Sequence, residues 1–203
     1  MKTVAGRILQ DEEAHVYEVL RSQRFLNMGG LSKEVPFFIY HYPPAWALEV
    51  ESAKGRVSTK LSSDDGLSVV EINLYDLAIK LLKERGVWER LLELEPTQDK
   101  YEFREILQGM LDPHDHLAPA IRKYLAVNPS NMVFLTGIGE VFPFIRTHTV
   151  MENLQSVVVG RPMLVWFPGT YEFTQVSGHQ LRALNLTMSD SYYRAKDILE
   201  QEA

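Results

Sequence analysis

The clearest candidate for binding chemistry is a glycine turn that follows a strongly apolar segment. Residues 132–135 are all apolar, and Thr136-Gly137-Ile138-Gly139 follows them directly. A turn of this kind between a strand and a helix offers free backbone N–H groups that attract phosphate. The turn therefore suggests a nucleotide or another anion as a ligand. The residues expected to line such a site are Thr136, Gly137, Gly139, Glu140 and Arg146.

The same turn departs from the standard phosphate-binding motifs. The dinucleotide fingerprint G-x-G-x-x-G needs a third glycine where this chain has Phe142, and a Walker A loop needs a Gly-Lys pair that the sequence lacks. Glu140 also adds a negative charge where phosphate would lie. These departures favour a tight turn that lets a helix pack close to its strand. A nucleotide-binding or phosphoryl-transfer protein with a degenerate site at 136–140 stays as the alternative.

The histidines do not form a recognisable catalytic or metal-binding pattern. His114 and His116 lie two residues apart, a spacing that does not bring side chains together on a helix. We interpret them as part of a solvated helix start, and we expect His41 and His148 to make structural hydrogen bonds. No G-x-S-x-G nucleophile elbow is present. The sequence therefore predicts no catalytic residue, no metal ligand and no cofactor.

Aromatic side chains form a second kind of candidate site. Most must belong to the core, since aromatic rings dominate core energetics. Some of those near the carboxyl end could instead make an exposed patch for a partner protein, because interface anchors are often aromatic. The candidates for such a patch are Tyr171, Phe173, Tyr192 and Tyr193.

Buried strands alternating with helices would position these side chains. We predict strands at 36–42, 67–72, 131–136 and 161–167, the last ended by Pro168-Gly169, and a weaker one at 181–186. This alternation indicates an α/β fold with a doubly wound, mostly parallel sheet of about five strands flanked by helices. It would resemble a P-loop-NTPase or Rossmann fold without a functional phosphate-binding motif. The carboxyl ends of parallel strands share one edge, where such folds bind ligands.

The helices are expected between these strands and at both ends of the chain. Residues 1–28 contain an N-terminal helix, and Asn73 is expected to cap a helix after the second strand. Residues 87–127 lack strand signals and are predicted to be a helical insertion of three short helices. Further helices are predicted at 46–61, 143–154 and 189–200, and residues 1–203 are taken as one domain.

Composition excludes several classes of protein. The chain has 203 residues, 45% of them hydrophobic, and no cysteine, which rules out disulfides, thiolate zinc sites and cysteine nucleophiles. Its 21 basic and 27 acidic residues give a net charge of −6, so direct DNA binding is disfavoured. We find no signal peptide and no apolar run long enough to span a membrane, and we therefore expect a cytoplasmic protein.

Several segments in a fixed order resemble the BrxB family. They are FLTGIGEVFPFIR at 134–146 with its continuation to 155, PMLVWFPGTY at 162–171 and YYRA at 192–195. The segments FFIYHY at 37–42 and EINLY at 71–75 are similar to the opening strands of the family. The resemblance runs from about residue 36 to the end of the chain, so that 1–203 would be one BrxB-like domain.

The resemblance implies a role in BREX, a bacterial anti-phage defence system. Other components of that system include the DNA methyltransferase PglX, the phosphatase-like protein PglZ and the large ATPase BrxC. No catalytic residues are established for the family, so the resemblance assigns none to this chain. It implies a non-catalytic adaptor or assembly subunit that binds other BREX proteins, PglZ first and BrxC or PglX as further candidates.

Overall fold

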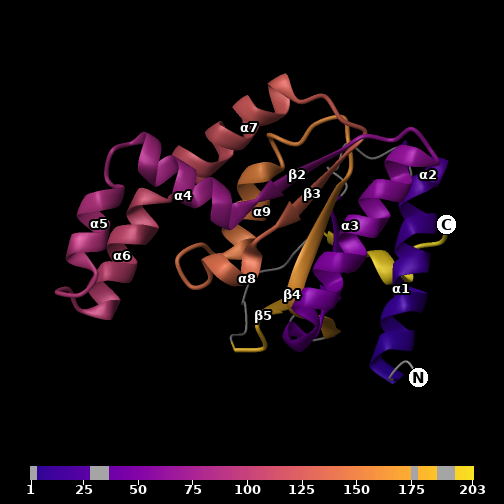
Figure 1. Cartoon of the computed structure of the whole chain (residues 1–203), viewed down its shortest axis with the longest axis horizontal. Helices are drawn as coiled ribbons and strands as arrows, with labels where there is room; N and C mark the ends of the chain where they lie inside the picture. Colours follow the sequence, from indigo (N-terminus) through magenta and orange to yellow (C-terminus); the bar gives the residue numbers. More distant parts are fainter. Residues whose placement is uncertain (1–3, 28–36, 175–177, 187–194) are drawn as a thin grey trace.

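A mostly parallel sheet forms the centre of the chain. The computed structural model describes residues 4–27, 37–174, 178–186 and 195–203 (Figure 1). In these residues the strands follow the order β2-β3-β4-β1-β6, and each pair in that order is parallel. A further strand, β5, pairs with β4 in antiparallel fashion. The predicted fold class is confirmed; the strands are β1 (Phe37–Tyr42), β2 (Val69–Asn73), β3 (Met132–Thr136), β4 (Met163–Thr174), β5 (Gly178–Ala183) and β6 (Ala195–Asp197).

One face of the sheet is covered by the N-terminal helices and the first crossover helix. These are α1 (Val4–Arg21), α2 (Gln23–Leu26) and α3 (Ala47–Ser63). A 3-10 turn, η1 (Pro44–Trp46), leads into α3. The helices bury their apolar stripes against strand residues such as Phe38, Tyr40, Phe134, Leu164 and Trp166.

The remaining helices lie on the side of the opposite face, and not all of them cover the sheet (Figure 1). They are α4 (Leu74–Glu84), α5 (Trp88–Leu94), α6 (Lys100–Met110), α7 (Ala118–Val127), α8 (Ile138–Val141) and α9 (Thr147–Leu154). A short π-helix, η2 (Pro113–Leu117), precedes α7, and the Asp112 side chain caps it. The α5 and α6 helices lie at one end of the molecule, away from the sheet (Figure 1). Helices on both faces make the sheet doubly wound, since α3 carries the chain from β1 to the far edge and the later helices return it.

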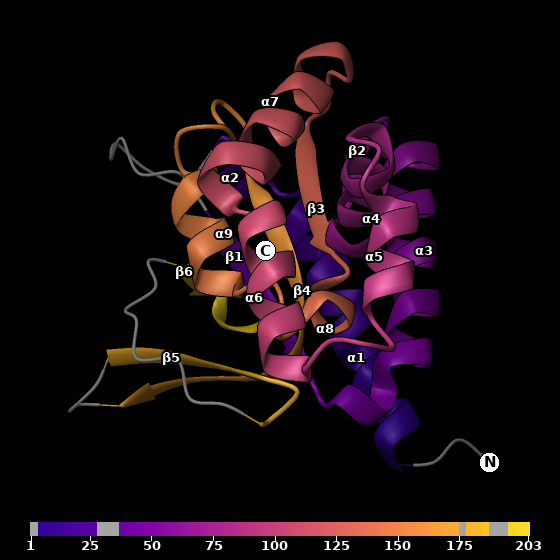
Figure 2. The same cartoon turned by 90° about the vertical axis from the view of Figure 1, so that its left-hand side faces the viewer.

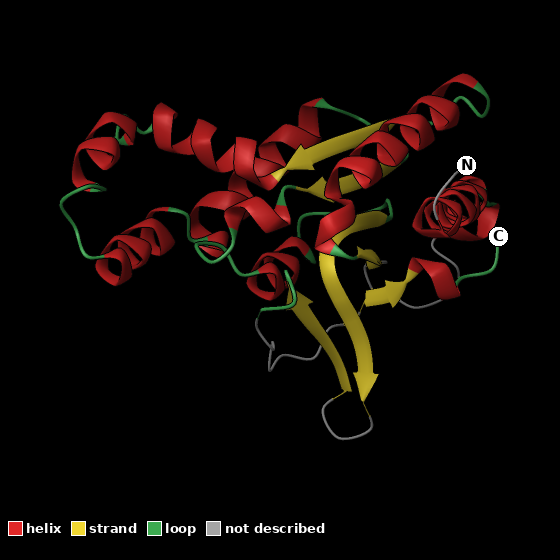
Figure 3. Ribbon diagram, turned by 60° about the horizontal axis from the view of Figure 1, so that its bottom comes forward, coloured by secondary structure: helices red, strands yellow, loops and turns green. Residues whose placement is uncertain are grey.

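The predicted end of the fourth strand is wrong. We expected it to stop at Pro168-Gly169, but β4 continues to Thr174 and forms a hairpin with β5 beyond the parallel sheet (Figure 3). Gly169 allows this course, because its φ is +155° and a Cβ there would lie 2.0 Å from the carbonyl oxygen of Arg182. The Pro168 carbonyl in turn accepts a hydrogen bond from the Leu184 amide at 2.8 Å.

The helix predicted at 143–154 begins in a different place. A short helix, α8, follows Gly137 directly, and α9 begins only at Thr147. Phe142 precedes a proline and adopts an extended conformation with ψ of 135°, which ends α8 at Val141. The amides of Phe144 and Ile145 then fold back onto the Val141 carbonyl in a turn.

The predicted final helix at 189–200 is also wrong in its described part. Residues 187–194 lie outside the described residues, but 195–197 form β6, followed by a 3-10 turn, η3 (Ile198–Glu200). The spacing of Ala195, Ile198 and Leu199 suits a helix face, yet pairing with β1 takes precedence. A local sequence pattern cannot predict pairing with a strand that is distant in the sequence.

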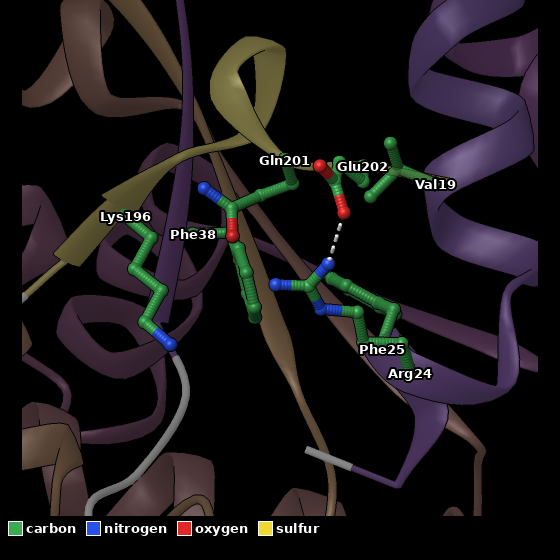
Figure 4. Close-up of a pocket in the computed structure, with 7 residues that line it drawn as sticks. All are labelled: Val19, Arg24, Phe25, Phe38, Lys196, Gln201 and Glu202. Atoms are coloured by element: carbon green, nitrogen blue, oxygen red, sulfur yellow. Dashed lines mark hydrogen bonds and ion pairs between the residues drawn. The ribbon is translucent and has the colours of Figure 1, made fainter. Parts of the chain in front are cut away.

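The N-terminal helix docks on this chain and is held by the C-terminal segment. The α1 helix contacts both α3 and η3. In a small pocket of about 30 Å³ at this junction, the Arg24 guanidinium lies 2.9 Å from the Glu202 carboxylate, beside Val19, Phe25 and Phe38 (Figure 4). Both charged side chains are exposed, so burial of the apolar residues contributes more to this docking than the ion pair.

Candidate functional site

The carboxyl ends of β2 and β3 lie side by side, with Asn73 paired to Thr136. Thr136 is buried, and its hydroxyl donates a hydrogen bond of 2.7 Å to the Glu71 carboxylate. The hydroxyl is therefore bound inside the protein and does not face solvent beside the glycine turn.

Glu71 is the centre of a polar network that joins three elements. The Lys54 ammonium, on α3, donates to the Glu71 carboxylate and to Glu51 at 2.9 Å. Only 5% of Lys54 is exposed, so its charge needs these partners. Because one Glu71 oxygen accepts from both Lys54 and Thr136, the network links α3, β2 and β3. Its groups neutralise one another, which is the arrangement of a structural network and not of an activated nucleophile.

The first glycine of the turn makes room for a helix cap. Gly137 has a φ of +73°, and a Cβ there would lie 2.3 Å from the Asn73 side-chain oxygen. That oxygen accepts hydrogen bonds from the amides of Tyr75 and Asp76 at 2.9 and 3.2 Å, so Asn73 caps α4 as predicted. Gly137 thus serves the close approach of two loops, the geometry of a tight turn.

The second glycine is covered by the hairpin end. A Cβ on Gly139 would lie 3.0 Å from Pro168 and 3.3 Å from Leu184. Ile138, between the two glycines, is buried in the core. These contacts count against an open cradle of N–H groups at this turn. Glu140 and Arg146 are exposed and belong to separate helix starts, those of α8 and α9.

We expect the Asn73→Ala variant to be destabilised by about 2 kcal/mol. Loss of an N-cap costs about 1 kcal/mol, and the space left against Gly137 adds a packing loss of about 1 kcal/mol. Asp99→Ala is the matched control, since Asp99 caps α6 in the same way and none of the described glycines lies against it. Urea unfolding should show the larger loss for Asn73; equal losses would refute a special role of the Asn73–Gly137 contact.

A groove that the sequence did not reveal lies next to this network. It has a volume of about 440 Å³ and runs past β2 from α3 to α4 and α7. Its floor includes Glu71, Ile72 and Asn73 of β2. The sequence contains one signal for it, a glutamate inside an otherwise apolar strand, which is typical of an edge strand.

The predicted aromatic patch has only one side chain that can be placed. Tyr171 is 7% exposed, and its hydroxyl donates to the Ala195 carbonyl at 2.7 Å. These contacts favour core packing over partner contact for Tyr171. Phe173 belongs to β4, but its side chain lies outside the described residues, as do Tyr192 and Tyr193 altogether.

The acidic and histidine side chains at the start of η2 are engaged with one another. The Asp112 carboxylate accepts hydrogen bonds from the amides of His114 and Asp115 at 2.9 Å each, and the His114 ring lies 2.7 Å from the Asp115 carboxylate. These three residues could surround a cation, but His114 and Asp115 are exposed and the contacts are those of a helix start. The solvated helix start predicted here matches this geometry.

His41 makes a structural contact with the last strand. Its Nε2 lies 3.2 Å from the Asp197 carboxylate. The hydrogen bond to Asp197 raises the pKa of His41, although burial opposes this. His148 differs, because burial lowers its pKa.

The contribution of His41 to stability should therefore decline as pH rises. A raised pKa in the folded state means that the stabilisation is complete below the reference pKa of 6.5 and disappears as pH rises through the folded pKa. We expect the difference in unfolding free energy between the wild type and His41→Gln to become smaller as pH rises from about 5.5 to about 8. Urea titrations at several pH values measure it, and the subtraction cancels the opposite contribution of His148. A difference that grows with pH would contradict the pairing.

Among the helices in the part of the chain that the structure describes, none combines the length and the apolar character that a membrane span requires.

Comparison with known proteins gives a consistent set of matches. The profile of the family described as "BREX protein BrxB" matches residues 70–198. A BREX protein BrxB from Bacillus cereus (strain H3081.97) is 31% identical over 174 residues, which cover 85% of this chain and 88% of the relative. Another from Escherichia coli O9:H4 (strain HS) is 30% identical over 188 residues, 93% of this chain and 90% of the relative. No solved structure matches.

Proposed function

This chain belongs to the BrxB family and is a BREX component, and on that premise we propose that it acts as a non-catalytic adaptor that binds other BREX proteins. As a BREX component, the chain takes part in phage defence. Its proposed role there is to hold other BREX proteins together.

The main support is that the glycine turn at the carboxyl edge of the sheet is filled. A doubly wound fold that binds a small ligand does so beyond the carboxyl ends of its strands. Here Gly137 is packed against the Asn73 cap and Gly139 against the hairpin end. The Thr136 hydroxyl at the same edge is bonded to Glu71. A turn whose glycines and hydroxyl are already packed and bonded suits a scaffold better than a catalyst.

PglZ is the partner that we propose first, with BrxC and PglX as the other candidates. The test is to co-express the tagged chain with each of these proteins in turn and to determine the mass of the purified product by size exclusion with light scattering. We expect a stoichiometric complex with at least one of them. A tagged unrelated protein of similar charge is the control for non-specific capture. A chain that elutes alone in every case would overturn the adaptor proposal.

Nucleotide binding is the alternative function, and the strand–turn–helix arrangement at 136–141 is the observation that supports it. We expect ATP or GTP with Mg²⁺ to leave the melting temperature unchanged, because the turn is packed on both glycines. A bound nucleotide at a free concentration of 100 times its Kd would stabilise the fold by about 2.7 kcal/mol. A dose-dependent rise of that size, lost in an Arg146→Ala variant, would favour the alternative instead.

A further inference from the structure

The β2 strand forms one edge of the sheet and has a neighbour on one side only. In the described part of the chain it pairs with β3 and with no other strand. Figure 2 shows β2 at the side of the sheet where α3 and α4 lie. An edge of this kind presents backbone N–H and C=O groups to whatever approaches it.

The hydrogen bonds of β3 identify which groups of β2 point outward. The Met132 amide donates toward the Ser68 carbonyl, whereas the Val133 amide donates to the Pro162 carbonyl on the other side. Successive residues of a strand direct their backbone groups to opposite sides. The backbone groups of Ser68, just before β2, and of Val70 and Ile72 therefore point toward β3. Those of Val69 and Glu71 point away from it.

The groove described above gives this edge walls as well as a floor. Glu51 of α3 lies on one side, and Asp76 and Lys80 of α4 with Tyr124 of α7 lie on the other. Such a groove suits a single extended chain, whose main chain would bond to the edge while alternate side chains enter the groove.

The charges of the groove indicate the chemistry of that chain. Glu51, Glu71 and Asp76 carry negative charge; Lys54 is already held between Glu51 and Glu71, and Lys80 stands 3.8 Å from Glu84. The Glu71 side chain is 40% exposed despite its bond to Lys54. An incoming Lys or Arg opposite Glu71 would find an acidic surface.

A second copy of this chain is a poor occupant. Antiparallel self-pairing along the whole of Val69–Asn73 would place the central Glu71 opposite its own equivalent. Like charges directly opposite one another destabilise strand pairs. The glutamate thus disfavours self-association and leaves the edge open to a basic strand.

We propose that the β2 edge is a docking site for an extended segment of another protein, bound by strand addition with a basic residue opposite Glu71. This inference rests on the adaptor proposal and specifies the surface that the adaptor uses.

The test is residue-resolved amide exchange by NMR on the isolated chain and on the complex obtained by co-purification. In the isolated chain the amides of Val69 and Glu71 should exchange fast, and those of Val70 and Ile72 slowly. In the complex, the Glu71 amide should slow by at least about tenfold. Fast exchange of Glu71 in both samples, or protection already present in the isolated chain, would overturn the proposal.

Two variants test the same edge through affinity. Val69→Pro removes one outward N–H and leaves the bonds to β3 in place, as edge strands tolerate; we expect about tenfold weaker binding or more. Asp76→Lys places a positive charge in the groove without altering β2, and covers the case in which the proline variant does not fold. Its matched control is Glu89→Lys, also an exposed acidic residue in a first helical turn, on the distant α5.

The outcomes separate this inference from the adaptor proposal. A complex that forms equally well with the Val69→Pro and Asp76→Lys variants would refute the β2 edge and leave the adaptor role standing. Failure to form a complex with any BREX protein would refute both. Protection of Glu71 that accompanies a doubled mass of the isolated chain would assign the edge to self-association and also overturn the proposal.

Discussion

Gly169→Ala should destabilise the chain by about 3 kcal/mol, at the upper end of the usual cost of forcing extra atoms into a packed site. The new Cβ would meet the Arg182 carbonyl oxygen at 2.0 Å, a backbone atom that cannot rotate away. To relieve the contact, β4 and β5 must separate where the hairpin leaves the sheet. We expect the melting temperature to fall by roughly 6–12 °C, as this size of chain implies.

Two other glycines provide the controls for that measurement. Gly66 has a φ of +66° with open space around it, so Gly66→Ala should cost only about 1 kcal/mol, from backbone strain. Gly109 lies inside α6 with nothing near it, and Gly109→Ala should stabilise by about 0.5–1 kcal/mol. If Gly169→Ala behaved like Gly66→Ala, the close approach of the two strands would not limit this position.

Glu71→Leu should cost about 2 kcal/mol. Removing one partner of a fully buried ion pair costs about 3–5 kcal/mol, but Glu71 is 40% exposed and Glu51 remains at 2.9 Å from Lys54. The loss is still large because the buried ammonium keeps only one carboxylate and the Thr136 hydroxyl loses its acceptor. Chemical denaturation measures it.

The pair can be separated from its surroundings by a double-mutant cycle. Lys54→Met retains most of the buried stem of the side chain, and combined with Glu71→Leu it leaves no unpaired charge between them. We expect the double variant to lose less than the sum of the single losses, with a coupling of about 1–2 kcal/mol. Glu71→Gln keeps an acceptor for Thr136 and should fall between wild type and Glu71→Leu. Additive losses would show that Lys54 and Glu71 do not stabilise each other.

Most of the parallel sheet could be predicted because its central strands are continuous apolar runs. β1 and β3 are buried almost throughout, and the α4 helix begins at the cap predicted for it, Asn73. These features are local: a cap, a run of apolar residues or a helical period lies within a few positions of the sequence.

The elements that were missed depend on contacts between distant residues. Pro168-Gly169 has the composition of a turn, but the glycine instead allows the Arg182 backbone to approach. The 195–200 segment has the spacing of a helix, yet the open edge of β1 draws it into the sheet. Neither partner lies nearby in the sequence, so no local pattern could reveal the outcome.

For the candidate site too, local features could be predicted from the sequence and contacts between distant residues could not. The sequence identified the glycine turn and its lack of phosphate-binding motifs, but not that Asn73 and the hairpin end fill it. It did not locate the groove beside β2, because the strand order was not determined and an edge strand could not be distinguished from a central one. A single glutamate among apolar residues was the only local indication.

The docking of α1 by the C-terminal segment sets the order in which the protein can be completed during synthesis. The α1 helix is made first. The elements β6, which pairs with β1, and η3, which contacts α1, are made last. At about 5–20 residues per second, ribosomes leave the apolar face of α1 without this support for roughly ten seconds or more. Until then Val16, Val19 and Leu20 can pack only on the parts of their cluster that are made earlier, such as α3, and this layer reaches its final packing only after translation has passed residue 200.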